Sequence, residues 1–93
     1  MKIYQSRTFE NKIKRFSQKE KEILDEEVKK IVENTLIGEE KKGDLRGIYV
    51  YKFKIKSIQY LLSYRLIKTG LELIMIGPHE NYYRDLKSYL KRR

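Results

Sequence analysis

The sequence predicts an α+β fold with the element order β-α-α-β-β-β-α. Residues 48–76 are typical of three consecutive strands, because apolar and polar side chains alternate and short turns separate the runs. Residues 17–36 are typical of an amphipathic helix with a capping box at its start. Strands joined by short turns pair in antiparallel fashion. We therefore expect an N-terminal helical hairpin packed on a mainly antiparallel four-stranded sheet, with a C-terminal helix.

The N-terminal half is expected to hold one strand and two helices. Lys2–Gln5 alternates as a short strand does, and Phe9–Phe16 has its apolar residues on one side of a brief helix. Ser17 and Glu20 then have the spacing of a capping box, so a longer helix begins here, and Gly38 is a natural C-terminal stop for it. The buried stripe of this helix is predicted to be Ile23, Leu24, Val28, Ile31, Val32 and Leu36.

The C-terminal half is expected to hold three strands and a helix. The strands are Ile48–Ile55, Ile58–Ile67 and Leu71–Ile76, with hairpin turns at residues 56–57 and 68–70. Gly77 and Pro78 end the last strand, and a helix follows from about Asn81. The stripe that this helix buries is predicted to be Tyr82, Leu86, Tyr89 and Leu90. With the helices packed on one face of the sheet, the opposite face would be open and basic.

Size and composition limit the classes of protein to which this chain can belong. At 93 residues the chain is expected to be one domain, residues 1–93. It has no cysteine and one histidine, which excludes disulfides, thiolate metal sites and most zinc sites, so we expect neither a metal nor a small-molecule cofactor. The sequence has no apolar run of membrane-span length and no signal peptide, which predicts a cytoplasmic protein with no membrane partner.

Positive charge is concentrated in the predicted sheet. The formal net charge is +9, and residues 41–68 hold eight cationic residues against one acidic residue, whereas residues 17–40 hold eight acidic residues against four lysines. Lys52, Lys54 and Lys56 alternate on one strand face, where like charges repel unless an anion lies over them. This predicts a polyanionic partner, either nucleic acid or an acidic protein segment; a solvated face is the other interpretation.

Three short motifs occur in order along the chain. They are Gly43–Gly47 (GDLRG), Tyr51–Lys54 (YKFK) and Gly77–Tyr83 (GPHENYY). Together with the helical hairpin, they make essentially the whole chain similar to the RelE/ParE superfamily of bacterial toxins from toxin–antitoxin pairs. That family contains ribosome-dependent mRNA endonucleases, which cut the codon in the decoding site, and relatives that poison DNA gyrase instead.

The resemblance implies roles for four residues if this chain is similar to the nucleases. Lys52 and Lys54 match strand lysines that contact the scissile phosphate, and Tyr83 matches a tyrosine that packs near the cleaved nucleotide. His79 stands where relatives carry an arginine or histidine for phosphate contact or proton transfer. The implied reaction is metal-free attack by the ribose 2′-hydroxyl. The implied partners are the ribosome, mRNA and a cognate antitoxin with an extended or helical segment that is at least partly acidic.

One position departs from the family pattern. Relatives usually place an arginine in the middle of the next strand, where this chain has Leu61. Arg65 lies on the same face about 13 Å away at strand rise, and Arg46 is another candidate replacement. With Lys56 and Arg84, these arginines complete the expected RNA- and phosphate-binding residues. Leu61 leaves two alternatives, a gyrase-directed toxin and an inactivated toxin that acts only by binding. A small basic RNA-binding protein unrelated to toxins is a third.

Each candidate residue also has a purely structural interpretation. His79 could cap the turn or the start of the last helix, and Tyr83 could lie over the sheet edge. Arg65 could pair with Glu72 across the hairpin, which is the commoner arrangement for an arginine in a strand. Helical phase places Tyr82 in the core and its neighbour Tyr83 outside it, where an aromatic ring beside cations can stack on an RNA base.

Overall fold

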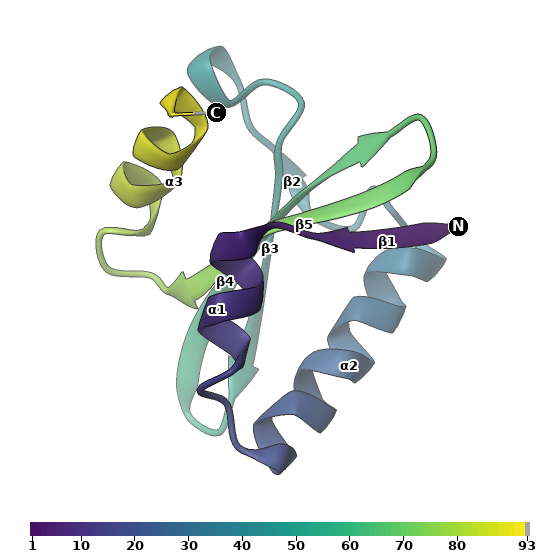
Figure 1. Cartoon of the computed structure of the whole chain (residues 1–93), viewed down its shortest axis with the longest axis vertical. Coiled ribbons are helices and arrows are strands. Elements are labelled where there is room, and N and C mark those ends of the chain that lie inside the picture. Colours follow the sequence, from purple (N-terminus) through teal and green to yellow (C-terminus); the bar gives the residue numbers. More distant parts are fainter. Residues whose placement is uncertain (93) are drawn as a thin grey trace.

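The computed structural model describes residues 1–92, and its elements follow the predicted order with one short strand added (Figure 1). The elements are β1 Lys2–Gln5, α1 Arg7–Ile13, α2 Gln18–Glu33, β2 Glu39–Glu40, a 3₁₀ turn η1 Gly43–Leu45, β3 Tyr49–Ile55, β4 Ile58–Ile67, β5 Gly70–Pro78 and α3 Tyr82–Lys91. None of these helices is long and apolar enough to cross a membrane.

Serine side chains begin the two N-terminal helices. Ser17 Oγ accepts a hydrogen bond from the Glu20 N–H (3.2 Å), and Glu20 Oε1 accepts one from the Ser17 N–H (2.8 Å), which confirms the predicted capping box. Ser6 Oγ accepts from the Phe9 N–H at 3.0 Å, so α1 begins two residues before its predicted start. Each cap stabilises its helix by about 1 kcal/mol.

Helix α2 ends earlier than its apolar pattern indicates. Its last residue is Glu33, because Asn34 leaves the helical region (φ −145°, ψ 89°). Leu36 therefore does not join the buried stripe, and 65% of its surface is exposed, so that part of the prediction was wrong. Gly38 is not the helix stop; its N–H donates to the Tyr64 hydroxyl at 3.0 Å, and a Cβ there would lie 2.9 Å from that oxygen. The glycine is needed for this close approach.

The sheet has five strands in the order β1-β5-β4-β3-β2. β1 pairs with β5 in parallel, and the other three pairings are antiparallel, so the α+β class and the mainly antiparallel sheet are confirmed. β2 is a fifth strand between α2 and β3, where no strand was predicted. β5 extends two residues beyond its predicted end, through Gly77 and Pro78, which brings the start of α3 back over the sheet.

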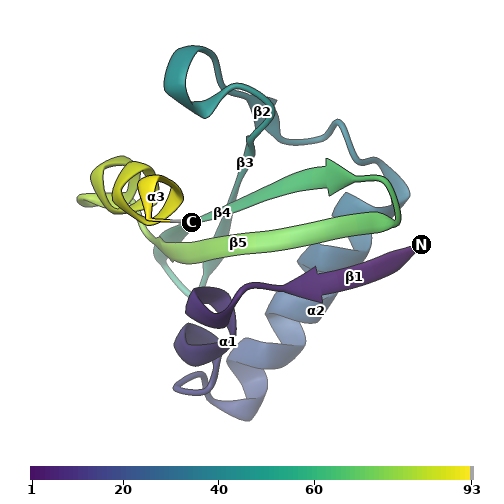
Figure 2. The same cartoon turned by 45° about the horizontal axis from the view of Figure 1, so that its top comes forward.

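The sheet carries a separate hydrophobic core on each face. On one face, residues of α1 and α2 such as Phe9, Leu24 and Ile31 pack on Phe53 and Leu62. The second core joins η1 and α3 to the other face, through Leu45, Ile48, Val50, Leu61, Ile74, Met75, Tyr82 and Leu86. Figure 2 shows α1 and α2 below β1 and β5, with α3 at the end of β5 far from the N-terminus. The expectation of one fully open basic face was therefore wrong, because its apolar residues require a cover.

Tyr82 anchors α3 to the sheet. Its side chain is 3% exposed, and its hydroxyl donates to the Met75 carbonyl oxygen at 2.7 Å and lies 2.8 Å from Ser63 Oγ. Burial raises the pKa of this hydroxyl above its ordinary value. This contact fixes the first turn of α3 and thereby the direction in which Tyr83 points.

Tyr82→Phe is expected to lower the free energy of unfolding by about 1 kcal/mol, because it deletes this buried hydrogen bond but keeps the ring. For a chain of this size the melting temperature should fall by roughly 4–8 °C, measured by circular dichroism. Tyr4→Phe is the matched control, since the Tyr4 hydroxyl donates to Thr69 Oγ1 (3.0 Å) at the surface. An equal effect of both substitutions would contradict the anchoring role of Tyr82.

Candidate functional site

The strand register places the candidate residues in neighbouring rows across the sheet. Lys52 pairs with Leu61, which pairs with Gly77. On the same face, Lys54 pairs with Gln59 two residues further along, and in the row between them Tyr60 pairs with Pro78, the residue before His79. Lys54 and His79 are thus about two strand spacings apart, roughly 10 Å between their backbones.

Lys52 and Lys54 project from β3 on the face that carries α3. Both side chains are exposed, and they alternate with the buried Phe53 and Ile55. Lys56 was expected to continue this row, but it lies in the β3–β4 turn with φ 59°, where the strand alternation has ended. The structure therefore brings two lysines, and not three, onto the strand face.

His79 and Tyr83 contact each other where the chain leaves β5 and enters α3. Their ring centroids are 6.2 Å apart, with the ring planes at 80°. Asn81 makes this close approach possible, because its left-handed backbone (φ 60°) turns the chain into the helix. Tyr82 is buried as predicted, and Tyr83 beside it is half-buried and partly open to solvent.

Glu39 and Lys41 complete this cluster, and the sequence analysis did not single them out. The Lys41 Nζ lies 2.6 Å from Glu39 Oε1 and 5.1 Å from the centroid of the Tyr83 ring. The hydrogen bond and charge of Lys41, with a smaller contribution from the charge of Lys52, hold the pKa of the Glu39 carboxyl below its ordinary value. A carboxylate that stays ionised therefore lies among the candidate cations.

The remaining predicted residues lie around this cluster in different environments. Leu61 is fully buried in the core beneath α3. Arg65 Nε lies 2.7 Å from Glu72 Oε1, which is the cross-strand ion pair considered as its structural interpretation. Arg46 is exposed at the end of η1, and Arg84 is exposed on α3, 3.4 Å from Asp85 Oδ1. The guanidinium groups of Arg65 and Arg84 therefore each have a carboxylate neighbour.

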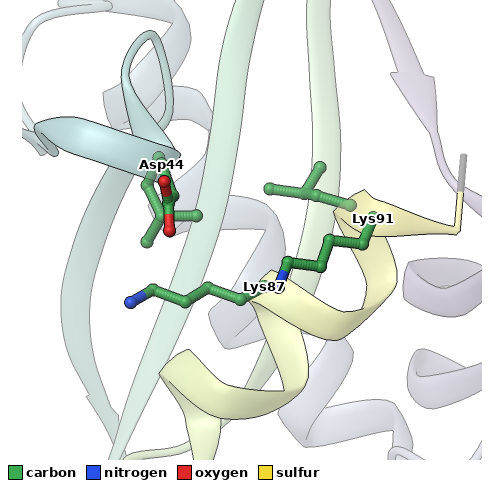
Figure 3. Close-up of a pocket in the computed structure, with 5 residues that line it drawn as sticks. Asp44, Lys87 and Lys91 are labelled. Atoms are coloured by element: carbon green, nitrogen blue, oxygen red, sulfur yellow. The ribbon is translucent and has the colours of Figure 1, made fainter.

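A hollow of about 250 Å³ separates η1 from α3. Leu45 and Leu90 give it an apolar lining, while Asp44, Lys87 and Lys91 complete its walls. Figure 3 shows Lys87 and Lys91 projecting from α3 and Asp44 projecting from the turn on the other side. Because Lys87 follows Tyr83 by four residues, the two side chains share one side of α3, and the hollow continues the candidate site along that helix.

These groups are suited to binding an anion and moving protons. Lys52 and Lys54 supply two exposed cations, His79 supplies an imidazole that can give or take a proton, and Glu39 supplies an ionised carboxylate. Tyr83 adds an aromatic surface beside them. The sequence could identify the lysines, the histidine and the tyrosine from their order, but the Glu39–Lys41 pair becomes apparent only when β2 is folded against β3.

Solved structures of the E. coli toxin RelE have the same fold as this chain. A double arginine-to-alanine mutant of toxin RelE in the free state is 19% identical, with a TM-score of 0.69 over 97% of this chain and 94% of that one. The intact E. coli RelBE toxin–antitoxin complex contains a chain 20% identical, with a TM-score of 0.65 over 84% of this chain and 95% of that one. At such low identity these similarities show the fold. No curated protein sequence matches the chain.

A family model provides the stronger assignment. The model of the ParE-like toxin of type II bacterial toxin–antitoxin systems matches residues 3–87, which include all of the strands except the first residue of β1, together with α1, α2 and residues 82–87 of α3. The match also contains the candidate site residues from Glu39 to Lys87, and of the residues that line the hollow only Leu90 and Lys91 lie beyond it. The chain is therefore a member of the ParE-like toxin family of type II bacterial toxin–antitoxin systems.

Proposed function

We propose that this toxin is a ribosome-dependent mRNA endonuclease. The observation that carries the proposal is the register of the sheet, since it aligns the exposed Lys52 and Lys54 with the strand end that presents His79 and Tyr83. Two cations, a histidine and an aromatic ring on one surface suit an RNA phosphate and the base beside it. RNA also supplies the ribose 2′-hydroxyl as its own nucleophile.

The proposed reaction is a metal-free transesterification. The 2′-oxygen forms a bond to the adjacent phosphorus, the bond from phosphorus to the 5′-oxygen breaks, and the products are a 2′,3′-cyclic phosphate and a 5′-hydroxyl. Lys52 and Lys54 stabilise the negative charge that develops on the phosphate oxygens. His79 gives a proton to the departing 5′-oxygen. One of the two lysines, in its uncharged form, accepts the proton of the 2′-hydroxyl while the other stays cationic, and Tyr83 stacks on a base.

The proposed inhibitor is a cognate antitoxin, as expected for a toxin–antitoxin family and as seen in the RelBE complex of the structural neighbour. An acidic segment would bind over Lys52 and Lys54, where it would neutralise the two exposed cations. An apolar side chain of the antitoxin would fit the hollow beside Leu45 and Leu90. Arg46, Lys56, Arg65 and Arg84 would add attraction for RNA around the site.

Primer extension on cellular mRNA after brief induction is the direct test. The wild type should produce cuts inside codons, and His79→Ala should lower their rate by about a hundredfold or more because the general acid is lost. Lys68→Ala is the control, since Lys68 lies in the β4–β5 turn at the far end of the sheet. Cuts that persist in His79→Ala at the wild-type rate would exclude His79 as the acid.

One observation favours a second function. Leu61 fills the position where nuclease relatives carry an arginine, and it is fully buried, so this face of the sheet has one cation fewer next to Lys52. A toxin that binds DNA gyrase without cutting RNA would not need that charge. Growth arrest with intact mRNA and induction of the DNA-damage response would support gyrase as the target and would overturn the nuclease proposal.

A further inference from the structure

Tyr83 is contacted by groups from two separate parts of the chain. His79 approaches it from the end of β5, and Lys41 lies over its ring from the segment that follows β2. Lys41 reaches this place because its backbone N–H donates to the Ile48 carbonyl oxygen at 2.9 Å, which continues the β2–β3 pairing by one residue. Glu39 and Lys41 are two residues apart on this extended segment, so their side chains point to the same side.

We propose that Lys41, held in place by Glu39, is a positioning residue that fixes the Tyr83 ring for stacking on the substrate base. The inference rests on the proposed nuclease function and adds to it a residue that does not touch the reacting atoms. An ammonium group within about 6 Å of a ring centroid is attracted to the electron-rich face of the ring. The 5.1 Å separation satisfies this condition, and the Lys41–Glu39 contact limits where the ammonium group can move.

Three features distinguish Lys41 from a residue that binds phosphate directly. Only 23% of its side chain is exposed, whereas the side chains of Lys52 and Lys54 lie at the exposed surface. Its ammonium group is already paired with Glu39, so the pair adds no net charge to the surface. The hydrogen bond to Glu39 also raises the pKa of Lys41, which favours the charged form of its side chain. These features suit a cation that is held in a fixed position over the Tyr83 ring.

The consequence for catalysis is preorganisation. Tyr83 is half-buried, so its ring has room to rotate unless neighbours hold it. Lys41 over the ring and His79 against it in an edge-on contact define one orientation before RNA arrives. An RNA base can then stack on a ring that is already in position. The entropic cost of ordering the ring is met during folding, and it no longer weakens binding.

A double-mutant cycle on cleavage of ribosome-bound mRNA tests the coupling. Lys41→Met keeps the length of the side chain and removes its charge, and it should slow cleavage about two- to fivefold. In a Tyr83→Leu background the same substitution should have no further effect, because there is no ring to position. Lys41→Arg should restore the rate, since a guanidinium also lies over aromatic rings. An equal loss in both backgrounds would overturn the inference and make Lys41 a phosphate contact.

A second measurement separates this inference from the proposed function. In the free protein, the ε-methylene protons of Lys41 should resonate upfield of ordinary lysine values, because the ammonium group next to them lies over the Tyr83 ring, and Tyr83→Leu should remove the shift. An unshifted Lys41 in the wild type would overturn the inference whatever the protein cleaves. If the Lys41 resonances are shifted but the protein cuts no mRNA, the nuclease proposal is overturned. Lys41 would then position the Tyr83 ring for a different partner.

Discussion

Replacing Lys52 and Lys54 together by methionine is expected to reduce mRNA cleavage by about a thousandfold or more. Removing one preorganised donor to a developing negative charge commonly lowers a rate by about 10²–10³, and these two lysines are the exposed cations on the strand face. Methionine keeps the length of the side chain, so packing on the neighbouring residues is retained. The rate is measured in a single-turnover assay on programmed ribosomes.

The control removes two charges from the opposite end of the sheet. Lys2 and Lys68 are both exposed, and Lys2 pairs with Gly70 next to the β4–β5 turn. Lys2→Met with Lys68→Met lowers the net charge by the same amount and should leave cleavage within a few-fold of the wild type. Equal losses from the two double substitutions would mean that the lysines act through general attraction of RNA, with no specific phosphate site on β3.

Leu61→Arg is expected to destabilise the fold and not to improve the enzyme. Leu61 is fully buried between β4 and α3, and an arginine there would place an unpaired charge in the second core, beside Lys52. An uncompensated buried charge costs about 3–5 kcal/mol, which is a large part of the stability of a small domain. Urea unfolding followed by circular dichroism should show a midpoint lower by about 2 M.

Gln59→Arg provides the matched comparison, because it adds the same side chain to the same face of β4 at an exposed position. It should change the free energy of unfolding by no more than about 0.5 kcal/mol. If Leu61→Arg proves as stable as Gln59→Arg and cuts mRNA faster than the wild type, then α3 does not cover Leu61 as described, and the position can hold the family's arginine.

The sequence was sufficient to predict the elements that local chemistry determines. The bounds of β1 and β4 agree with prediction, because turn residues and alternating side chains determine them. The capping box at Ser17 was recognisable for the same reason. The end of α2 was misplaced because Leu36 has the helical spacing, but the helix ends at Glu33 and leaves Leu36 exposed.

The arrangement of the elements in space was harder to predict from the sequence. The position of α3 on the face opposite α1 and α2 depends on packing between Tyr82, Leu86 and Leu61, which no local pattern encodes. The same limit applies to the site. Lys52, Lys54, His79 and Tyr83 stood out because their order resembles a family, whereas Glu39 and Lys41 are ordinary charged residues until a two-residue strand pairs with β3.

The parallel pairing of β1 with β5 bears on when the chain can become active. β1 lies at the N-terminus, and its partner begins at Gly70, so the sheet cannot be completed until most of the chain has been synthesised. His79 and Tyr83 follow later still, and the carboxyl-terminal residues of a chain are the last to leave the ribosome. A nascent chain that has not reached Gly70 therefore has an unpaired β1 and neither His79 nor Tyr83. Closure of the sheet by β1 and β5 is therefore a late event in synthesis, and the candidate site is completed after it.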